Sequence, residues 1–272
     1  MNRKKYIMII LLALIGWGCE EVLDETIDFE QTNLLVVEGV LTNERTRHKI
    51  KLTHPYDTQN AEERPATGAV VIIVDSDENF TFLREVPRGS GEYYTNPFRA
   101  VFGKAYGLVI RYKDKEYQAF DAAPPGQLLR PLQYESAEVD GETMFEIDFE
   151  DSGNNPNYIN YQIDWSATST CNSQAEDCTA KLVYYDLKNI DVQEVYAPDK
   201  EVFYFPPQST VIRRRYSIST PYREFLRSLL LETEWSGGLF DIQRDQVPTN
   251  LTEGAIGFFA VTTVVSDTTI VE

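Results

Sequence analysis

Short strand-like segments, which are either β-branched apolar runs or alternate between polar and apolar residues, constrain the fold of this chain more than any other feature. Alternation with a period of two residues is typical of half-buried β-strands. About seven such segments fit into roughly 90 residues, separated by turn-forming residues, which is the spacing of a β-sandwich. The segment 48–53 alternates, whereas 34–41 and 69–74 are apolar runs rich in β-branched residues, and 105–112 is a further strand-like segment. We therefore predict an N-terminal sandwich, Ig-like or transthyretin-like, over residues 34–123.

The sequence Pro124-Pro125-Gly126 predicts a linker, because it favours neither helix nor strand. Strand-like segments continue after it, and an apolar stretch at 255–265 is predicted to be a core strand that closes the fold. We therefore predict a second β-sandwich-like domain over residues 127–272. Its other strand-like segments lie at 143–149, 158–165, 182–185, 202–205 and 210–217.

A single α-helix is predicted in this second domain, near residues 220–235. Ser219 or Thr220 can cap its start, and Pro221 suits the first turn, where its missing N–H costs nothing. Gly237-Gly238 is predicted to end it. One apolar face results from residues spaced three and four apart, namely Tyr222, Phe225, Leu226, Leu229 and Leu230. The predicted fold is therefore mainly β with one helix.

Residues 1–18 have the pattern of a cleaved signal peptide. Three basic residues precede the apolar stretch 6–18, whose thirteen residues extend only ~20 Å as a helix, short of a ~30 Å hydrocarbon core. Cys19 then follows a small residue, which resembles the lipobox of bacterial lipoproteins. Gly16 and Trp17 depart from that motif, and a secreted protein with an incidental Cys19 is the alternative. We expect Cys19 to be acylated.

Residues 19–33 are predicted to be a lipidated acidic tether. Glu20, Glu21, Asp24 and Glu25 resemble the tag that follows the lipidated cysteine in surface-exported lipoproteins of the Bacteroidota. The alternative is a solvated tether without an export function. We expect an outer-membrane protein whose folded part faces the cell surface.

The chain is strongly acidic, with a net charge of −18. Cleavage after residue 18 would remove three basic residues and lower this charge to −21. Such a chain repels nucleic acid and anionic membrane surfaces, so we expect no nucleic-acid partner.

Three cysteines are present, and Cys171 and Cys178 remain as a pair if Cys19 carries lipid. A short polar loop separates them, and an oxidising periplasm or cell surface would allow a disulfide, which we predict. Free thiols and a zinc site are the alternatives. Zinc is disfavoured because neither a second cysteine pair nor a nearby histidine is present. We expect no metal and no cofactor.

The chain contains an ordered series of motifs near its C-terminus. They are the aromatic-rich helix 222–229, Gly237-Gly238-Leu239-Phe240-Asp241, Pro248-Thr249-Asn250-Leu251 and 254–260. With Cys19-Glu20-Glu21, 35–39 and 68–72 at the front, this order resembles the domain of unknown function family 4249. The sequence departs at 241–243, where the family has an Asp-Pro-Pro-like turn.

The resemblance implies an outer-membrane lipoprotein of the Bacteroidota, of a kind often encoded beside TonB-dependent receptors, and it implies no catalytic residue. Independently of the resemblance, Gly254 and Gly257 are predicted to allow a backbone conformation next to a core strand that other residues rarely adopt. Residues 248–250 are predicted to form the turn before that strand.

Few residues suggest chemistry. No zinc-protease motif, nucleophile elbow or phosphate-binding loop is found, so we predict no catalytic residue. Carboxylates are abundant, which leaves a glycosidase-like pair open. Residues 75–79 have the alternating oxygen ligands of a calcium loop but Phe80 at the glycine position, so a hairpin turn is favoured.

Two further motifs have alternative interpretations. Arg213 and Arg215 of a strand would point one way and Arg214 the other. Their charge would either prevent an edge strand from pairing with another chain or form a contact for an anionic partner. Phe203-Tyr204-Phe205 would form a sugar-stacking platform or, by default, part of a sandwich core.

The leading functional hypothesis is a non-enzymatic binding or accessory module for a TonB-dependent transporter of the outer membrane. The alternatives are an envelope scaffold or adhesin and, less favoured, a hydrolase that uses paired carboxylates.

Overall fold

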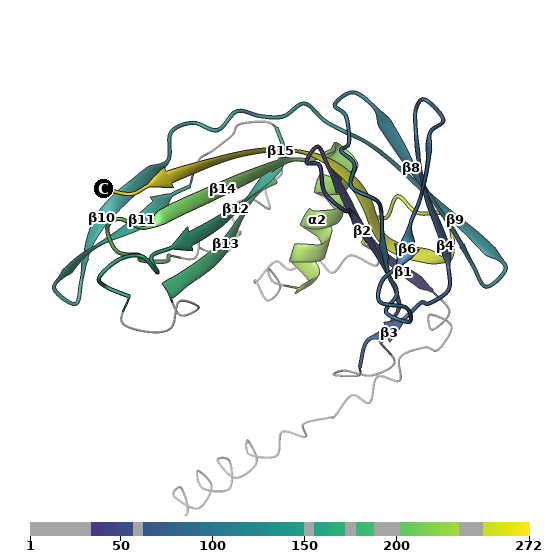
Figure 1. The fold of residues 1–272 in the computed structure, drawn as a ribbon, viewed down its shortest axis with the longest axis horizontal. Helices are drawn as coiled ribbons and strands as arrows, with labels where there is room; N and C mark the ends of the chain where they lie inside the picture. Colours follow the sequence, from purple (N-terminus) through teal and green to yellow (C-terminus); the bar gives the residue numbers. More distant parts are fainter. Residues whose placement is uncertain (1–33, 57–61, 150–154, 172–177, 188–201, 234–246) are drawn as a thin grey trace, which may run out of the picture. The chain divides into compact units, whose positions relative to one another are not determined.

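The computed structural model describes residues 34–56, 62–149, 155–171, 178–187, 202–233 and 247–272. These residues form fifteen strands in three sheets and one α-helix (Figure 1), which confirms the prediction of a mainly β fold. No helix among them is long and apolar enough to cross a bilayer. The predicted signal peptide and the tether, with Cys19, Glu20, Glu21, Asp24 and Glu25, lie outside the described residues.

The N-terminal strands belong to two sheets that share a core. One sheet contains β1 (Leu35–Thr42), β2 (Lys49–His54), β7 (Glu92–Tyr94) and β6 (Arg84–Glu85), and β3 (Arg64–Pro65) pairs with β2. The other has the order β5 (Phe80–Phe82), β4 (Val70–Asp75), β8 (Ala105–Tyr112) and β9 (Lys115–Ala122). Alternate side chains point into the core, and Val37 and Leu108 are each 0% exposed. Burial therefore alternates along these strands, as expected for sheets with one face in the core.

His48 lies just before β2 and is buried in this part of the fold. Its Nε2 atom is 3.1 Å from the carbonyl oxygen of Phe98, and the two rings meet edge to face. Burial lowers the pKa of His48, and the hydrogen bond to Phe98 raises it by less. The folded protein therefore favours the neutral imidazole.

Acidification is expected to weaken the fold through His48. The pKa of His48 in the folded protein lies below the unfolded value of 6.5. The contribution of His48 to the free energy of unfolding is therefore complete above about pH 6.5 and is lost as the pH falls towards the folded-state pKa. The free energy of unfolding should fall through this residue by at most about 1.4 kcal/mol per pH unit. Urea unfolding between about pH 8 and about pH 5 measures it. His48→Gln, which does not titrate, should flatten the curve, and an unchanged slope in that variant would contradict the prediction.

The last strand, β15 (Ala255–Ile270), belongs to both halves of the structure. Its first half is parallel to β1, from Leu35 opposite Ala255 to Thr42 opposite Thr262. Its second half is antiparallel to β14 (Thr210–Ser217) and begins with Thr263 opposite Ser217. One nine-stranded sheet results, and Figure 1 shows β15 in yellow running from one half of it to the other.

Asn43 bridges the point at which β15 leaves β1. Its side-chain nitrogen donates to the carbonyl of Val264 at 3.1 Å, and its Oδ1 accepts from the Val264 N–H at 2.7 Å. Because β1 ends at Thr42, this side chain continues the pairing that the backbone has stopped making. The predicted boundary at 124–126 stays a prediction, but residues 255–262, which we expected in the C-terminal domain, pair with β1 of the N-terminal sandwich.

In the second half of the structure, both faces of the nine-stranded sheet are covered by other elements. The sheet continues through β12 (Asn157–Asp164) and β13 (Thr179–Asp186). The hairpin of β10 (Gln133–Val139) and β11 (Glu142–Asp148) packs on one face, where Ile147 meets a core containing Ile159, Tyr161, Phe205 and Val211. The helix α2 (Thr220–Thr233) packs on the other, against Tyr216, Phe258 and Val264.

The helix begins as predicted. The hydroxyl of Ser219 accepts from the N–H of Tyr222 at 3.3 Å, and the Ser219 carbonyl accepts from the N–H of Arg223 at 3.0 Å. Tyr222, Leu226 and Leu230 of the predicted apolar face are buried. The Tyr222 ring lies 5.0 Å from that of Phe258. The predicted end at Gly237-Gly238 lies outside the described residues.

The two glycines at the start of β15 have the backbone role that we expected. Gly254 has a φ of 88° and Gly257 a φ of 95°, which other residues rarely adopt. A Cβ atom on Gly257 would lie 2.1 Å from the carbonyl oxygen of Val37 in β1. In the preceding turn, the Asn250 side chain donates to the carbonyls of Phe120 and Phe259, both at 2.8 Å, and so joins β9 to β15.

Candidate functional site

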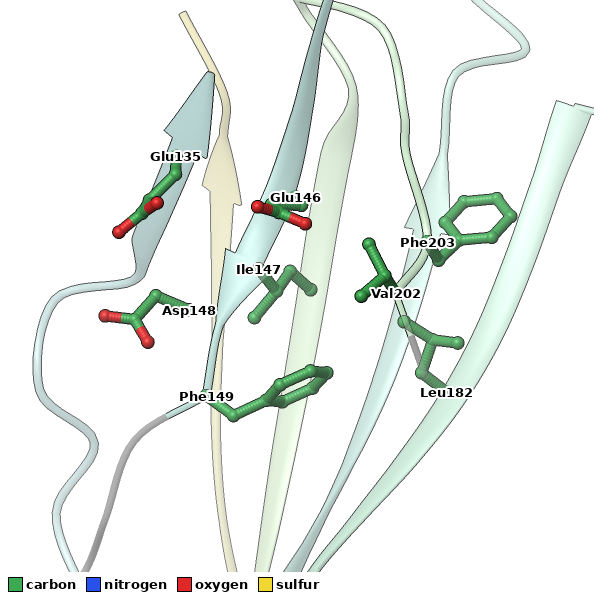
Figure 2. A pocket seen from close by; sticks show the side chains of 8 residues that line it. All are labelled: Glu135, Glu146, Ile147, Asp148, Phe149, Leu182, Val202 and Phe203. Atoms are coloured by element: carbon green, nitrogen blue, oxygen red, sulfur yellow. The ribbon is translucent and has the colours of Figure 1, made fainter. Parts of the chain in front are cut away.

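A cavity of about 210 Å³ opens between the β10–β11 hairpin, β13 and residues 202–203 (Figure 2). One side of it is apolar and the other carries carboxylates. The lining residues are Glu135, Glu146, Ile147, Asp148, Phe149, Leu182, Val202 and Phe203.

The cavity exists because two extended segments meet and then separate. Phe145 of β11 and Phe205 exchange two backbone hydrogen bonds, of 2.8 and 2.9 Å. Two residues beyond Phe145 in β11 is Ile147, and two residues before Phe205 is Phe203. Both Ile147 and Phe203 line the cavity. Because backbone groups alternate in direction along a strand, the N–H and C=O of Ile147 point the same way as those of Phe145. The edge of β11 at Ile147 therefore faces the opening.

Aromatic contacts hold the apolar side of the cavity in place. Phe149 stacks on Tyr184 of β13 with ring centroids 4.8 Å apart, and it meets Tyr161 edge to face at 5.5 Å. Phe203 lies 5.9 Å from the ring of Trp165. A wall supported in this way keeps its shape, as ligand pockets generally do before they bind.

Three carboxylates line the other side. Glu135 and Glu146 are directly opposite each other in the hairpin, and Asp148 lies two residues beyond Glu146 on the same face. Like charges directly opposite each other destabilise a strand pair. None of the three forms a hydrogen bond or ion pair with another residue in the part of the chain that the structure describes. No described residue therefore occupies their oxygens.

The chemistry of the cavity suits an amphipathic ligand. Apolar faces can pack on Phe149 and Phe203, while hydroxyl or ammonium groups can bond to the carboxylates. Both a sugar and an extended peptide with a basic side chain have these properties. The arrangement does not favour the hydrolase alternative, because all three acids come from the hairpin and the opposite side carries Leu182, Val202 and Phe203.

The sequence identified only part of this site. Of the predicted stacking platform, Phe203 lines the cavity, Phe205 is in the core at 0% exposure and Tyr204 is 39% exposed. The carboxylates were missed. The strand at 143–149 was predicted, but only its pairing with β10 brings Glu146 next to Glu135.

The three consecutive arginines lie where their alternation predicts, but not on an edge strand. That prediction is wrong, because β14 has β12 on one side and β15 on the other. Arg213 and Arg215 are 1% and 3% exposed, so the predicted partner contact is not available through them. Arg214 points to the other face, pairs with Glu44 and lies over the Tyr216 ring.

The buried arginines hold the predicted linker against the sheet. Arg213 donates to the carbonyl of Arg130 at 2.6 Å, and Arg215 donates to that of Leu128 at 2.8 Å. Gly126 passes so close to β15 that a Cβ atom there would lie 2.8 Å from Cγ2 of Thr263. Residues 124–132 are therefore a strap across one face of the sheet.

The segment 75–79 is a hairpin turn between β4 and β5. Oδ1 of Asp75 accepts from the N–H groups of Asp77 at 3.0 Å and Asn79 at 2.9 Å. The ammonium group of Lys104 pairs with both Asp75 and Asp77. These bonds, above all those from Asn79, lower the pKa of Asp75 to about 2. A lysine already supplies positive charge to this turn, which agrees with the hairpin interpretation rather than the calcium loop.

Cys171 and Cys178 form a disulfide, with Cα atoms 5.8 Å apart. The carbonyl of Cys178 accepts from the N–H of Trp165 at 3.0 Å, so the disulfide lies where β12 and β13 begin to pair. Because Trp165 also contacts Phe203, this end of the β12–β13 pair supports one side of the cavity.

A family model for a domain of unknown function, DUF4249, matches residues 20–268. The chain belongs to the DUF4249 family. Because the match extends almost to the end of β15, the DUF4249 unit includes the N-terminal sandwich, the cavity and the strand that both halves share. No curated protein matched the chain.

Proposed function

We propose that this DUF4249 protein is a non-enzymatic binding module, lipid-anchored at the outer membrane and exposed at the cell surface, that assists a TonB-dependent transporter. The observation that carries the proposal is the cavity at the β10–β11 hairpin, which has apolar side chains on one side and, on the other, carboxylates that no described residue pairs with. Cys19 and the acidic residues after it support the anchor and the exposure. Capture of a sugar or peptide for import is the role that fits these features together.

Substitutions in the cavity should weaken ligand binding without unfolding the protein. A glycan and peptide array identifies the ligand, and titration calorimetry measures its affinity. Phe203→Ala removes a stacking surface and Glu146→Gln removes a charge, and each should weaken binding at least about tenfold. Tyr204→Ala is the matched control, because Tyr204 is adjacent to Phe203 but does not line the cavity. Equal affinity in all four proteins would show that the ligand binds elsewhere.

The anchor is tested separately. With its own leader in a Gram-negative host, the wild-type chain should sediment with outer membranes, and its N-terminal peptide should carry acyl chains on Cys19 by mass spectrometry. Cys19→Ser should release it into the soluble fraction, whereas Cys171→Ser should not. An unmodified N-terminus would remove the basis for the proposed location.

The transporter is tested by co-purification from detergent-solubilised outer membranes of the source organism. We expect a TonB-dependent receptor to be retained in stoichiometric amount. Purification without any outer-membrane barrel would contradict the accessory role while leaving the ligand result intact.

A further inference from the structure

The outer face of the β5-β4-β8-β9 sheet is apolar although no described residues cover it. Val71, Ile73, Leu108 and Ile110 point into the core, so their neighbours in the strands point outwards. An antiparallel sheet with one face in the core normally presents polar residues on the other. Here three phenylalanines dominate that other face, Phe80 at 63%, Phe82 at 63% and Phe120 at 69% exposure.

Strand register makes these side chains one continuous surface. Phe80 is opposite Val74, and Phe82 is opposite Ile72. Val74 is in turn opposite Gly107, and Gly107 is opposite Phe120, whose ring would lie 3.2 Å from a Cβ atom on that glycine. Val70, at 48% exposure, extends the surface at the far end of β4. We call this set of residues the outer phenylalanine face.

The size of the outer phenylalanine face fits the centre of a protein interface. A phenylalanine side chain has about 200 Å² of surface, so the three rings at these exposures offer roughly 400 Å². Protein interfaces are about 56–65% apolar, so this patch is the apolar part of an interface of roughly 700 Å² per partner. Stable complexes bury about 800 Å² per partner.

The charges on this face point to a partner with the same surface. Its ionised residues are Arg111 and Glu116, which form an ion pair of 2.8 Å. The face is therefore neutral in a chain of net charge −18, and repulsion between two copies would not act at the contact. A two-fold contact requires a self-complementary surface, which one arginine beside one glutamate provides. An anionic lipid surface would instead require an excess of basic residues.

We propose that two copies of this chain form a two-fold dimer through the outer phenylalanine face. The two sheets would pack face to face at the roughly 10 Å spacing of a β-sandwich, with the phenylalanines of both copies between them. The proposal is independent of the ligand, the lipid anchor and the transporter.

Photo-crosslinking in the full chain tests the dimer. Phe120→p-benzoylphenylalanine places a reactive group on the face, and the full chain is irradiated in the cells that produce it. We expect a product of twice the chain mass, in which mass spectrometry finds only this chain. The same group at Glu138, an exposed position of the β10–β11 hairpin, should give no such product.

Substitutions separate this contact from chance collisions. Phe80→Ser combined with Phe82→Ser should reduce the crosslinked product at least tenfold while the circular-dichroism spectrum stays that of the folded chain, because both rings are mainly exposed in one copy. Phe102→Ser is the matched control, since Phe102 is 62% exposed in a loop outside this face. Crosslinks to another protein or to lipid alone, no crosslink, or a crosslink that the double variant leaves intact would each overturn the proposal.

Discussion

Gly257→Ala is expected to lower the free energy of unfolding by at least about 3 kcal/mol, a large part of the roughly 5–15 kcal/mol that stabilises a typical domain. Two effects combine at this position. A φ of 95° is strained for any residue with a side chain. The new Cβ atom would also lie 2.1 Å from the carbonyl oxygen of Val37, so β1 and β15 would have to separate there. Urea unfolding followed by circular dichroism measures the loss.

Gly254→Ala is the matched control for this prediction. Gly254 has a similar φ of 88°, but the nearest atom to its Cβ position is Cε1 of Tyr117, at an acceptable 3.4 Å. Backbone strain alone should therefore cost about 1 kcal/mol. If the two variants lose the same free energy, the close approach of β1 to β15 contributes nothing.

Asp267→Ala is expected to destabilise the protein by about 2–3 kcal/mol. Arg213 is 1% exposed, and its guanidinium donates to both carboxylate oxygens of Asp267, at 2.9 and 2.5 Å. Removal of the carboxylate leaves a buried positive charge with less compensation, which costs more than the intact pair contributes. The expected loss is below the 3–5 kcal/mol typical of fully buried pairs, because the Asp267 side chain is 36% exposed.

A double-mutant cycle distinguishes this cost from a loss of packing. Arg213→Met combined with Asp267→Ala should be more stable than Asp267→Ala alone, because methionine does not require a counter-charge. Arg214→Met provides the comparison, since the Arg214 side chain is 40% exposed and its pair with Glu44 is worth less than about 1 kcal/mol. Additive effects of the substitutions at 213 and 267 would show that the pair is not coupled.

Local features of the fold could be predicted from the sequence because their causes are local. Strand alternation at 48–53 reflects one buried face, and the start of α2 follows from the capping hydroxyl of Ser219 and from Pro221. The pairing of distant strands could not be predicted. Nothing in residues 255–262 specifies β1 as their neighbour, because β-branched and aromatic segments pair with any strand of matching register.

The same limit applies to the arginines and to the cavity. The alternation of Arg213, Arg214 and Arg215 was predictable, but whether a charged strand lies at an edge depends on β12 and β15 pairing with it. Charge alone suggested an edge, whereas Asp267 and the carbonyls of the strap allow burial. In the cavity, Phe203 was identifiable as an aromatic residue before a proline pair. The carboxylates became recognisable only through the register of a hairpin whose β10 strand was not predicted.

The pairing of β1 with β15 also determines when the protein can finish folding. Of the described strands β1 leaves the ribosome first, and it must wait for β15, whose Ala255 lies 220 residues after its partner Leu35, because Phe259 and Val261 complete the core around Val37 and Leu41. Until then the N-terminal half has an open edge and an unfilled interior, a state that chaperones recognise. For a chain that is exported, as we propose, this delay is useful: a polypeptide that cannot close on itself early stays thin enough to pass through a translocation channel.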